Sequence, residues 1–139
     1  MLRTTPLDPV AWLAGEPGAR DDDAAPPHSP RLDVDVKNGV PGFELDSNGN
    51  VEGGIRTPQV AAPIAKLSGT GQPPASQSFC RIFGTTVPFT SAQLSALYPT
   101  HAAFVTAWDK AVDREVRAGF LLPADASRLK DVAAMSTIP

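Results

Sequence analysis

The sequence predicts an α+β fold, in which short antiparallel strands are followed by a pair of C-terminal helices. Apolar and acidic residues alternate over residues 32–36, which is the period of a half-buried strand. After residue 100, apolar residues recur at the spacing of an amphipathic helix. The repeated strand–helix alternation that a complete parallel sheet requires is missing from the sequence.

The N-terminal segment, residues 1–30, is predicted to be loosely ordered. A short helix can begin at Pro9, and residues 16–30 then form a linker rich in Pro and Asp. The chain contains 15 prolines, and proline blocks helix interiors and central strands because it has no N–H. We therefore divide the chain into this segment and a folded region over residues 31–139.

Three short strands are predicted in the first half of the folded region, at residues 32–36, 43–45 and 51–55. Asn48 and Gly49 lie between the second and the third strand. An Asn-Gly pair supplies the positive φ angles of a tight hairpin turn. The sequence therefore predicts a hairpin around these two residues.

Residues 57–89 are predicted to be irregular, because prolines interrupt them repeatedly. Apolar patches at residues 60–67 and 79–83 are candidates for edge strands. The single cysteine, Cys80, lies in the second patch, which indicates a small buried side chain rather than a reactive thiol.

The last fifty residues are predicted to be helical. A short helix is capped by Thr90 or Ser91 and stopped by Pro99, and Thr100 caps the longest helix, which ends near Gly119. The apolar face of the long helix is formed by Phe104, Val105, Trp108, Val112 and Val116. That of the final helix is formed by Leu129, Val132 and Ala133. The two helices are expected to pack as an antiparallel pair through a short connection.

The catalytic candidates are few. No Gly-x-Ser-x-Gly nucleophile elbow occurs in the sequence. His101 begins the long helix, where a helix N-terminus disfavours a protonated imidazole, so a neutral ring could act as a base. We favour a packing or capping role for His101. The alternative is a minimal hydrolase in which His101 works with Ser91 or Ser95.

The most distinctive motif is the hexamer Gly53-Gly54-Ile55-Arg56-Thr57-Pro58. Its glycines and basic residue are not spaced as a phosphate-binding loop. Arg56 could clamp a carboxylate of a ligand. We favour a structural motif, with Gly53, Gly54 and Pro58 shaping the backbone and Arg56 paired within the chain.

No metal site and no cofactor are expected. Asp46, Asn48 and Asn50 resemble the beginning of a calcium loop, but Val51 and Thr57 occupy positions that need Gly and Glu. The net charge of −3 argues against nucleic-acid binding, and no apolar run is long enough to cross a membrane. No signal peptide is recognised, so a soluble, cytoplasmic protein is the default expectation.

The sequence also resembles the C-terminal region of the large bacterial "alpha/beta hydrolase domain-containing" proteins. The Gly-Gly-Ile-Arg-Thr-Pro block makes the resemblance fairly specific, and an acidic insertion at Asp21–Asp23 departs from it. The matching segments are residues 46–58, 80–84, 97–101, 104–105 and 119–126.

The resemblance implies an incomplete piece of an α/β-hydrolase-type protein. In that family, the segments that carry the nucleophile and a candidate histidine lie upstream of this region, so no catalytic residue is carried over. His101 matches a family position that has no known role. The first hypothesis is therefore an inactive part that covers a catalytic core. The second is a stand-alone interaction module, because the C-terminal helices have an apolar stripe that needs cover from this chain or another. The expected partners are the missing catalytic part or a second copy.

Overall fold

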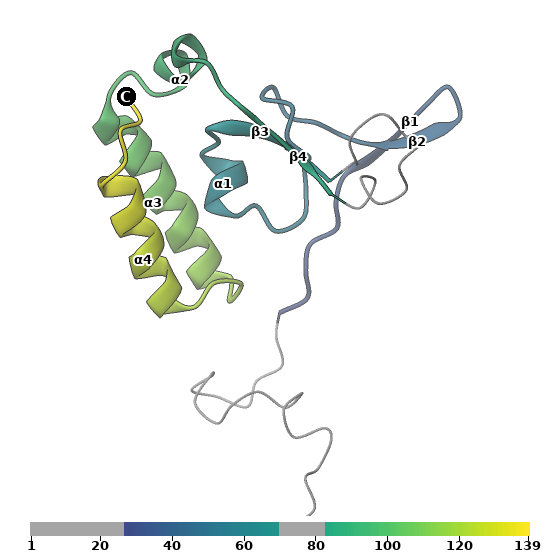
Figure 1. Cartoon of the computed structure of the whole chain (residues 1–139). Helices are drawn as coiled ribbons and strands as arrows, with labels where there is room; N and C mark the ends of the chain where they lie inside the picture. Colours follow the sequence, from purple (N-terminus) through teal and green to yellow (C-terminus); the bar gives the residue numbers. More distant parts are fainter. Residues whose placement is uncertain (1–26, 70–82) are drawn as a thin grey trace, which may run out of the picture.

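The computed structural model describes residues 27–69 and 83–139. Within them the fold is α+β, as predicted, with two two-stranded antiparallel sheets and four helices. Helices α3 and α4 lie side by side, and the first hairpin projects on the other side of the molecule (Figure 1). The short helix predicted at Pro9 and the surroundings of Cys80 lie outside the described residues.

The first sheet is a hairpin of β1 (Val34–Lys37) and β2 (Val40–Phe43). The turn between them was not predicted. It is made by Asn38 and Gly39, whose φ angles are 54° and 78°. Two successive positive φ angles match the twist of the flanking strands, which is why Asn-Gly closes tight hairpins. The same dipeptide also occurs at 48–49, where the sequence did predict a hairpin turn.

A turn forms at residues 46–50, where it was predicted, but of Asn48 and Gly49 only Gly49 has the expected positive φ, at 81°. The Asp46 N–H donates to the Asn50 carbonyl oxygen at 2.8 Å, and the Gly49 N–H donates to the Asp46 carbonyl oxygen at 2.9 Å. Across this turn, Leu45 and Val51 form a single antiparallel bridge. The strand predicted over 51–55 is wrong in extent, because that segment forms only isolated bridges.

At the open end of the first hairpin, a ring of backbone hydrogen bonds joins three segments, which contain Asp33, Glu44 and Glu52. The Asp33 N–H donates to the Glu52 carbonyl oxygen at 3.1 Å, and the Glu52 N–H donates to that of Glu44 at 2.9 Å. The Glu44 N–H completes the ring by donating to the Asp33 carbonyl oxygen at 3.0 Å. Each segment therefore depends on the other two.

The second sheet pairs β3 (Ala65–Ser68) with β4 (Thr85–Pro88). The patch at 60–67 was predicted as an edge strand, and this is right only from Ala65 onward. Its first part belongs to α1 (Pro58–Ala61). Pro58 suits the beginning of a helix, because its φ is already helical and the N–H it lacks would have no partner there.

The C-terminal helices agree closely with the prediction. They are α2 (Ser91–Leu97), α3 (His101–Arg117) and α4 (Pro123–Ala134). Thr90 forms a capping box with Gln93, and the Thr100 hydroxyl accepts from the Ala103 N–H. Gly119 has a φ of 78°, the left-handed conformation that favours glycine just beyond a helix.

The core lies among these helices and α1. Its buried residues are Ala62, Tyr98, Phe104, Trp108, Val112, Ala126 and Ala133. The Trp108 indole N–H donates to the Leu129 carbonyl oxygen at 3.0 Å, and Lys130 Nζ lies 2.6 Å from Asp113 Oδ1. These contacts join α3 to α4 in the predicted pair.

Two expectations about burial are wrong. Of the predicted packed face of α4, Ala133 is buried and Leu129 packs against the core, but Val132 is 59% exposed and Ala126 is buried in its place. The apolar stripe of α3, which was expected to need cover from this chain or another, is covered from within this chain, since Phe104 and Val112 are buried against α4 and α1. The strand predicted at residues 32–36 was expected to be half buried, but its apolar residues Leu32, Val34 and Val36 are 49%, 55% and 62% exposed.

Candidate functional site

The distinctive hexamer is organised around Arg56. Arg56 Nη2 lies 2.7 Å from Asp46 Oδ2, and Nη1 donates to the Val51 carbonyl oxygen at 2.7 Å. Nη2 also donates to the Val60 carbonyl oxygen at 3.3 Å. Arg114 of α3 reaches the carbonyl oxygen of Arg56 itself at 3.0 Å. The guanidinium thus joins the turn to α1 inside the chain.

The environment of Asp46 is matched to a negative charge. Burial by itself would raise the pKa of this carboxyl, but hydrogen bonds from the backbone of Asn50, from Arg56 and from the backbone of Asn48 outweigh it. The net result is a pKa below the usual value for aspartate. The carboxylate therefore stays ionised in its pair with Arg56.

Sequence reasoning missed the role of Asn50. This residue is 1% exposed, and its side chain accepts from the Leu67 N–H at 2.7 Å and donates to the Ala65 carbonyl oxygen at 3.2 Å. The Asn50 side-chain amide thus makes to β3 the two hydrogen bonds that the backbone of a neighbouring strand would make. A buried Asn must satisfy both ends of its amide, and this one does so with backbone groups.

The glycines of the hexamer allow close backbone approach. Gly53 has a φ of 72°, and a Cβ there would lie 2.5 Å from the Arg31 carbonyl oxygen. Gly54 has a φ of 64°, and its Cβ would lie 2.5 Å from the Leu32 side chain. The Gly54 N–H donates to the same Arg31 carbonyl oxygen at 2.8 Å. The backbone contacts exclude a side chain at Gly53, whereas at Gly54 the positive φ disfavours one and the Leu32 side chain would have to move.

His101 lies against the end of the chain. Its Nδ1 is 2.8 Å from the Ile138 carbonyl oxygen, and its Nε2 is 3.2 Å from the Ala134 carbonyl oxygen. Among the described residues, these two carbonyl oxygens are the hydrogen-bond partners of the ring, and neither Ser91 nor Ser95 is one. The geometry is that of a side chain that fastens the C-terminal segment to α3.

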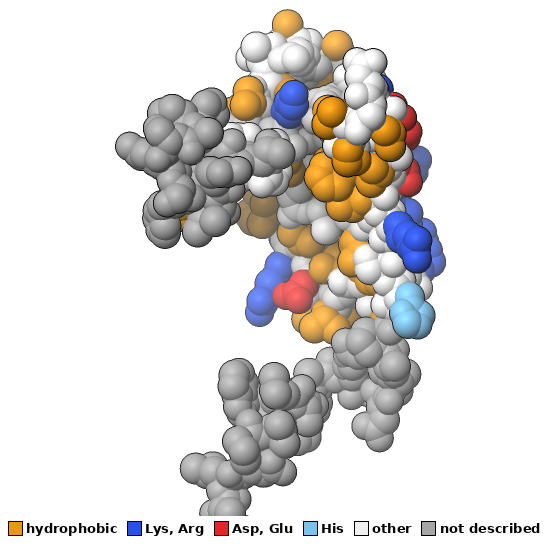
Figure 2. Space-filling view, turned by 90° about the vertical axis from the view of Figure 1, so that its right-hand side faces the viewer, with side chains coloured by type: hydrophobic (Ala, Val, Ile, Leu, Met, Phe, Trp, Pro, Cys, Tyr) orange, Lys and Arg blue, Asp and Glu red, His pale blue; other side chains and the backbone are white. Residues whose placement is uncertain are grey.

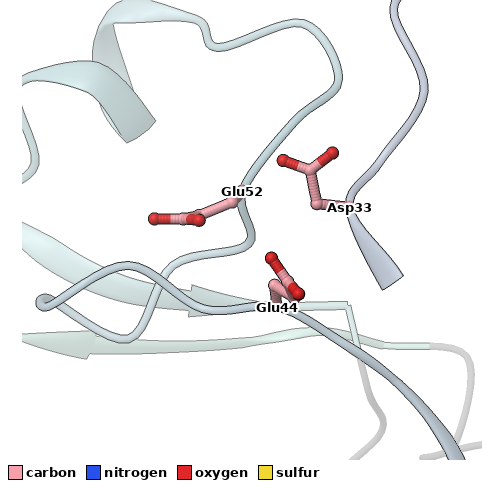
Figure 3. A group of neighbouring side chains, drawn as sticks. All are labelled: Asp33, Glu44 and Glu52. Atoms are coloured by element: carbon pink, nitrogen blue, oxygen red, sulfur yellow. The ribbon is translucent and has the colours of Figure 1, made fainter. Parts of the chain in front are cut away.

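The ring of backbone bonds brings three carboxylates together. Asp33, Glu44 and Glu52 each offer an oxygen atom, and these atoms lie within 4.8 Å of one another. Figure 3 shows that the side chains come from three separate segments. Within the described residues this is the group that could hold a cation, although exposed acidic groups of this kind are common without one.

Two hollows lie near these residues. An open cavity of about 530 Å³ lies between the second sheet and the segment 50–55, and Asn50, Gly53 and Leu67 are among the residues that line it. A smaller one of about 170 Å³ lies between the hexamer and the α3–α4 connection, with Glu115 in its wall. Glu115 is 5% exposed and lies 3.1 Å from Arg114 Nε. Neither hollow brings a serine hydroxyl together with His101.

These features define the class of protein as an α+β assembly in which a glycine- and arginine-containing motif connects small sheets to a helical core. Residues 19–131 match the family described as "Alpha/beta hydrolase domain", and the chain belongs to this family. No curated protein and no solved structure gives a significant match. Among the described helices, none is long and apolar enough to cross a membrane.

Proposed function

We propose that this chain is an accessory part of an alpha/beta hydrolase-family protein and has no hydrolytic activity of its own. Acyl transfer by this class of enzyme needs a nucleophile on a rigid turn, a base within hydrogen-bond reach and amides facing the oxyanion. The chain supplies the family's peripheral hairpins and helices, and the catalytic groups come from elsewhere.

The observation that carries this proposal is the environment of His101. A general base must present a free ring nitrogen to its nucleophile, with the other nitrogen oriented by a third group. Here the ring nitrogens face the carbonyl oxygens of Ile138 and Ala134. A carbonyl oxygen only accepts, so the protonated ring nitrogen donates to one of these two oxygens and ties the ring to the C-terminal segment, which supports a structural role for the histidine.

The test is ester hydrolysis by the purified chain, with p-nitrophenyl acetate and p-nitrophenyl butyrate as substrates. We expect turnover no faster than the background of exposed imidazoles. His28 is an exposed histidine outside the core and provides the matched control. We expect His28→Ala and His101→Ala to lower the rate of ester hydrolysis by no more than the background contribution of one exposed imidazole. Saturable turnover that is lost in His101→Ala, Ser91→Ala or Ser95→Ala, with the helical fold retained, would refute the proposal.

A second candidate is a protein-interaction module that acts without a hydrolase core. The observation that favours it is the helical core, whose apolar residues Phe104, Trp108 and Val112 are buried within the chain itself. A cooperative thermal transition of the isolated chain, together with a defined oligomeric state, would support this candidate. A non-cooperative melt with aggregation would support dependence on a catalytic core.

A further inference from the structure

The smaller cavity, of about 170 Å³, combines apolar walls with one buried charge. The walls include Pro58 of α1, Leu129 of α4, and Phe120 and Leu121 of the connection between α3 and α4. Glu115 of α3 supplies a carboxylate. The cavity is unlike the hydrophobic side chains that gather on the face of the molecule in Figure 2, because it is recessed between elements and contains a charged group.

The Glu115 carboxylate has an oxygen that the fold leaves available. The residue is 5% exposed, and its Oε1 accepts from Arg114 Nε at 3.1 Å. Within residues 27–69 and 83–139, no other hydrogen bond reaches this carboxylate. A carboxylate has room for several donors, and burial without them is costly. The second oxygen, Oε2, is therefore an acceptor for a ligand in the cavity.

A second polar group at the cavity is the hydroxyl of Thr57. Thr57 occupies the N-cap position of α1, but its side chain makes no capping hydrogen bond. A threonine in this position usually accepts from a backbone N–H of the first helical turn. Here the side chain lines the cavity, and because the residue is exposed it lies where the cavity opens to solvent. Its oxygen is thus a second acceptor for a donor that Glu115 binds.

We propose that this cavity binds a small primary alkylammonium ion, with the ammonium on Glu115 Oε2 and the hydrocarbon against the apolar walls. A charged donor makes a hydrogen bond to a carboxylate roughly twice as strong as a neutral pair makes. A guanidinium fits less well, because its planar fork needs both carboxylate oxygens and Arg114 already holds one of them. An anionic ligand is repelled by the same carboxylate.

The volume limits the hydrocarbon to about four carbons, since a cavity of about 150 Å³ accommodates benzene and this one has about 170 Å³. A ligand this small binds weakly, with a dissociation constant on the order of 1 mM. The inference is independent of whether the chain hydrolyses esters, because neither His101 nor a serine lines this cavity.

Titration of the full chain with n-butylammonium chloride, followed by two-dimensional NMR near neutral pH, tests the proposal. The Phe120 and Leu121 amides report on the cavity because both donate to the Glu115 carbonyl oxygen. The Trp108 indole N–H reports on its opposite wall, since it donates to the Leu129 carbonyl oxygen. We expect saturable shifts of these signals, and at least about tenfold weaker binding of n-butanol and of butyrate at the same ionic strength.

Three variants separate the contributions. Glu115→Gln keeps the size of the side chain and an oxygen for Arg114 but removes the charge, and it should weaken butylammonium binding at least about tenfold. Thr57→Val removes the hydroxyl without removing a cap, and it should weaken binding about threefold. Glu44→Gln is the matched control, because it makes the same change at an exposed carboxylate outside the cavity, and it should leave the dissociation constant unchanged.

Three results would overturn the proposal. Cavity signals that do not shift up to about 50 mM butylammonium would show that no such ligand binds there. Equal affinity for n-butanol would show that the carboxylate contributes nothing. Equal weakening by Glu44→Gln and Glu115→Gln would place the cation at exposed carboxylates instead. If Glu115→Gln does not fold, the preference of the wild type for butylammonium over n-butanol and the effect of Thr57→Val still decide the question.

Discussion

Arg56, Asp46 and Asn50 hold the polar junction between the hairpins and the helices. The contacts depend on how each of these side chains holds its hydrogen-bonding atoms, which other residue types do not reproduce. Arg56 presents two nitrogens in one plane, and these reach a carboxylate and two carbonyl oxygens. Asn50 presents a donor and an acceptor side by side to β3. Substitutions that keep the charge or the size of these side chains but lose this geometry should therefore lower the free energy of unfolding.

Arg56→Lys should lower the free energy of unfolding by about 2 kcal/mol, because one ammonium group cannot replace the planar fork and leaves a buried acceptor without its donor. Chemical denaturation followed by circular dichroism measures the loss. Arg128→Lys is the matched control, since that side chain is 82% exposed and lies 3.7 Å from Asp125. It should change stability by less than about 0.5 kcal/mol. Equal losses in the two variants would contradict the role given to Arg56.

Tyr98 provides a titration that needs no mutation, because it is the only tyrosine in the chain. Burial raises the pKa of its phenol to about 12, and the hydroxyl donates to the Pro63 carbonyl oxygen at 3.1 Å. The phenolate absorbance should therefore rise near pH 12 in the folded protein and near pH 10 in denaturant.

The sign of the linked stability follows from this shift. The pKa of Tyr98 is higher in the folded than in the unfolded state, so its contribution is fully present below about pH 10 and is lost as the pH rises toward 12. Tyr98→Phe should show a smaller loss of stability over that interval than the wild type. A folded-state midpoint near 10 would contradict the buried environment.

The helices were predictable because their signals are local. Thr90 and Thr100 cap the first turns, and the spacing of Phe104, Trp108 and Val112 defines the packed face of α3. Strand extent was less predictable. Residues 51–55 have the composition of a strand, but they pair with two different segments in turn, so only isolated bridges form. The contacts of Asn50 and the clustering of Asp33, Glu44 and Glu52 depend on distant pairing, which no local pattern encodes.

The hexamer and the first hairpin offer a paired test of glycine. Gly53→Ala should cost about 3 kcal/mol or more, because the added Cβ meets backbone atoms of Arg31 and Asp33 in addition to the strain at a positive φ. Gly39→Ala should cost about 1 kcal/mol, since φ is also positive but no atom lies within 4 Å of the added Cβ. Thermal melts of the two variants give the comparison, and equal losses would show that the close approach at Gly53 is unimportant.

Across the described chain, stability is expected to be uneven. Helices α3 and α4 bury Phe104, Trp108 and Val112, whereas the β1–β2 hairpin buries little. Regions with few buried apolar contacts open at low free-energy cost, and core helices open only with the whole fold. The hairpin is therefore expected to open more readily than the helical part.

Hydrogen exchange in dilute protein measures this unevenness. Amides of β1 and β2 should exchange at least about tenfold faster than those in the middle of α3. The Leu67 amide, which bonds to the buried Asn50 side chain, should be slow although it lies in a two-stranded sheet. Uniform protection across the β1–β2 hairpin and the helices would contradict this account.

The ring of backbone bonds joining Asp33, Glu44 and Glu52 has a kinetic consequence. The two Asn-Gly turns involve neighbouring residues, so they can form on the microsecond timescale of hairpins. The ring closes only when the segment that contains Asp33 and the one that contains Glu52 have both arrived, and this closure carries the entropy of a larger loop. The closure of the ring at Glu44 is therefore a late event in folding. A nascent chain halted before Glu52 would contain the first hairpin without the segment that closes the ring.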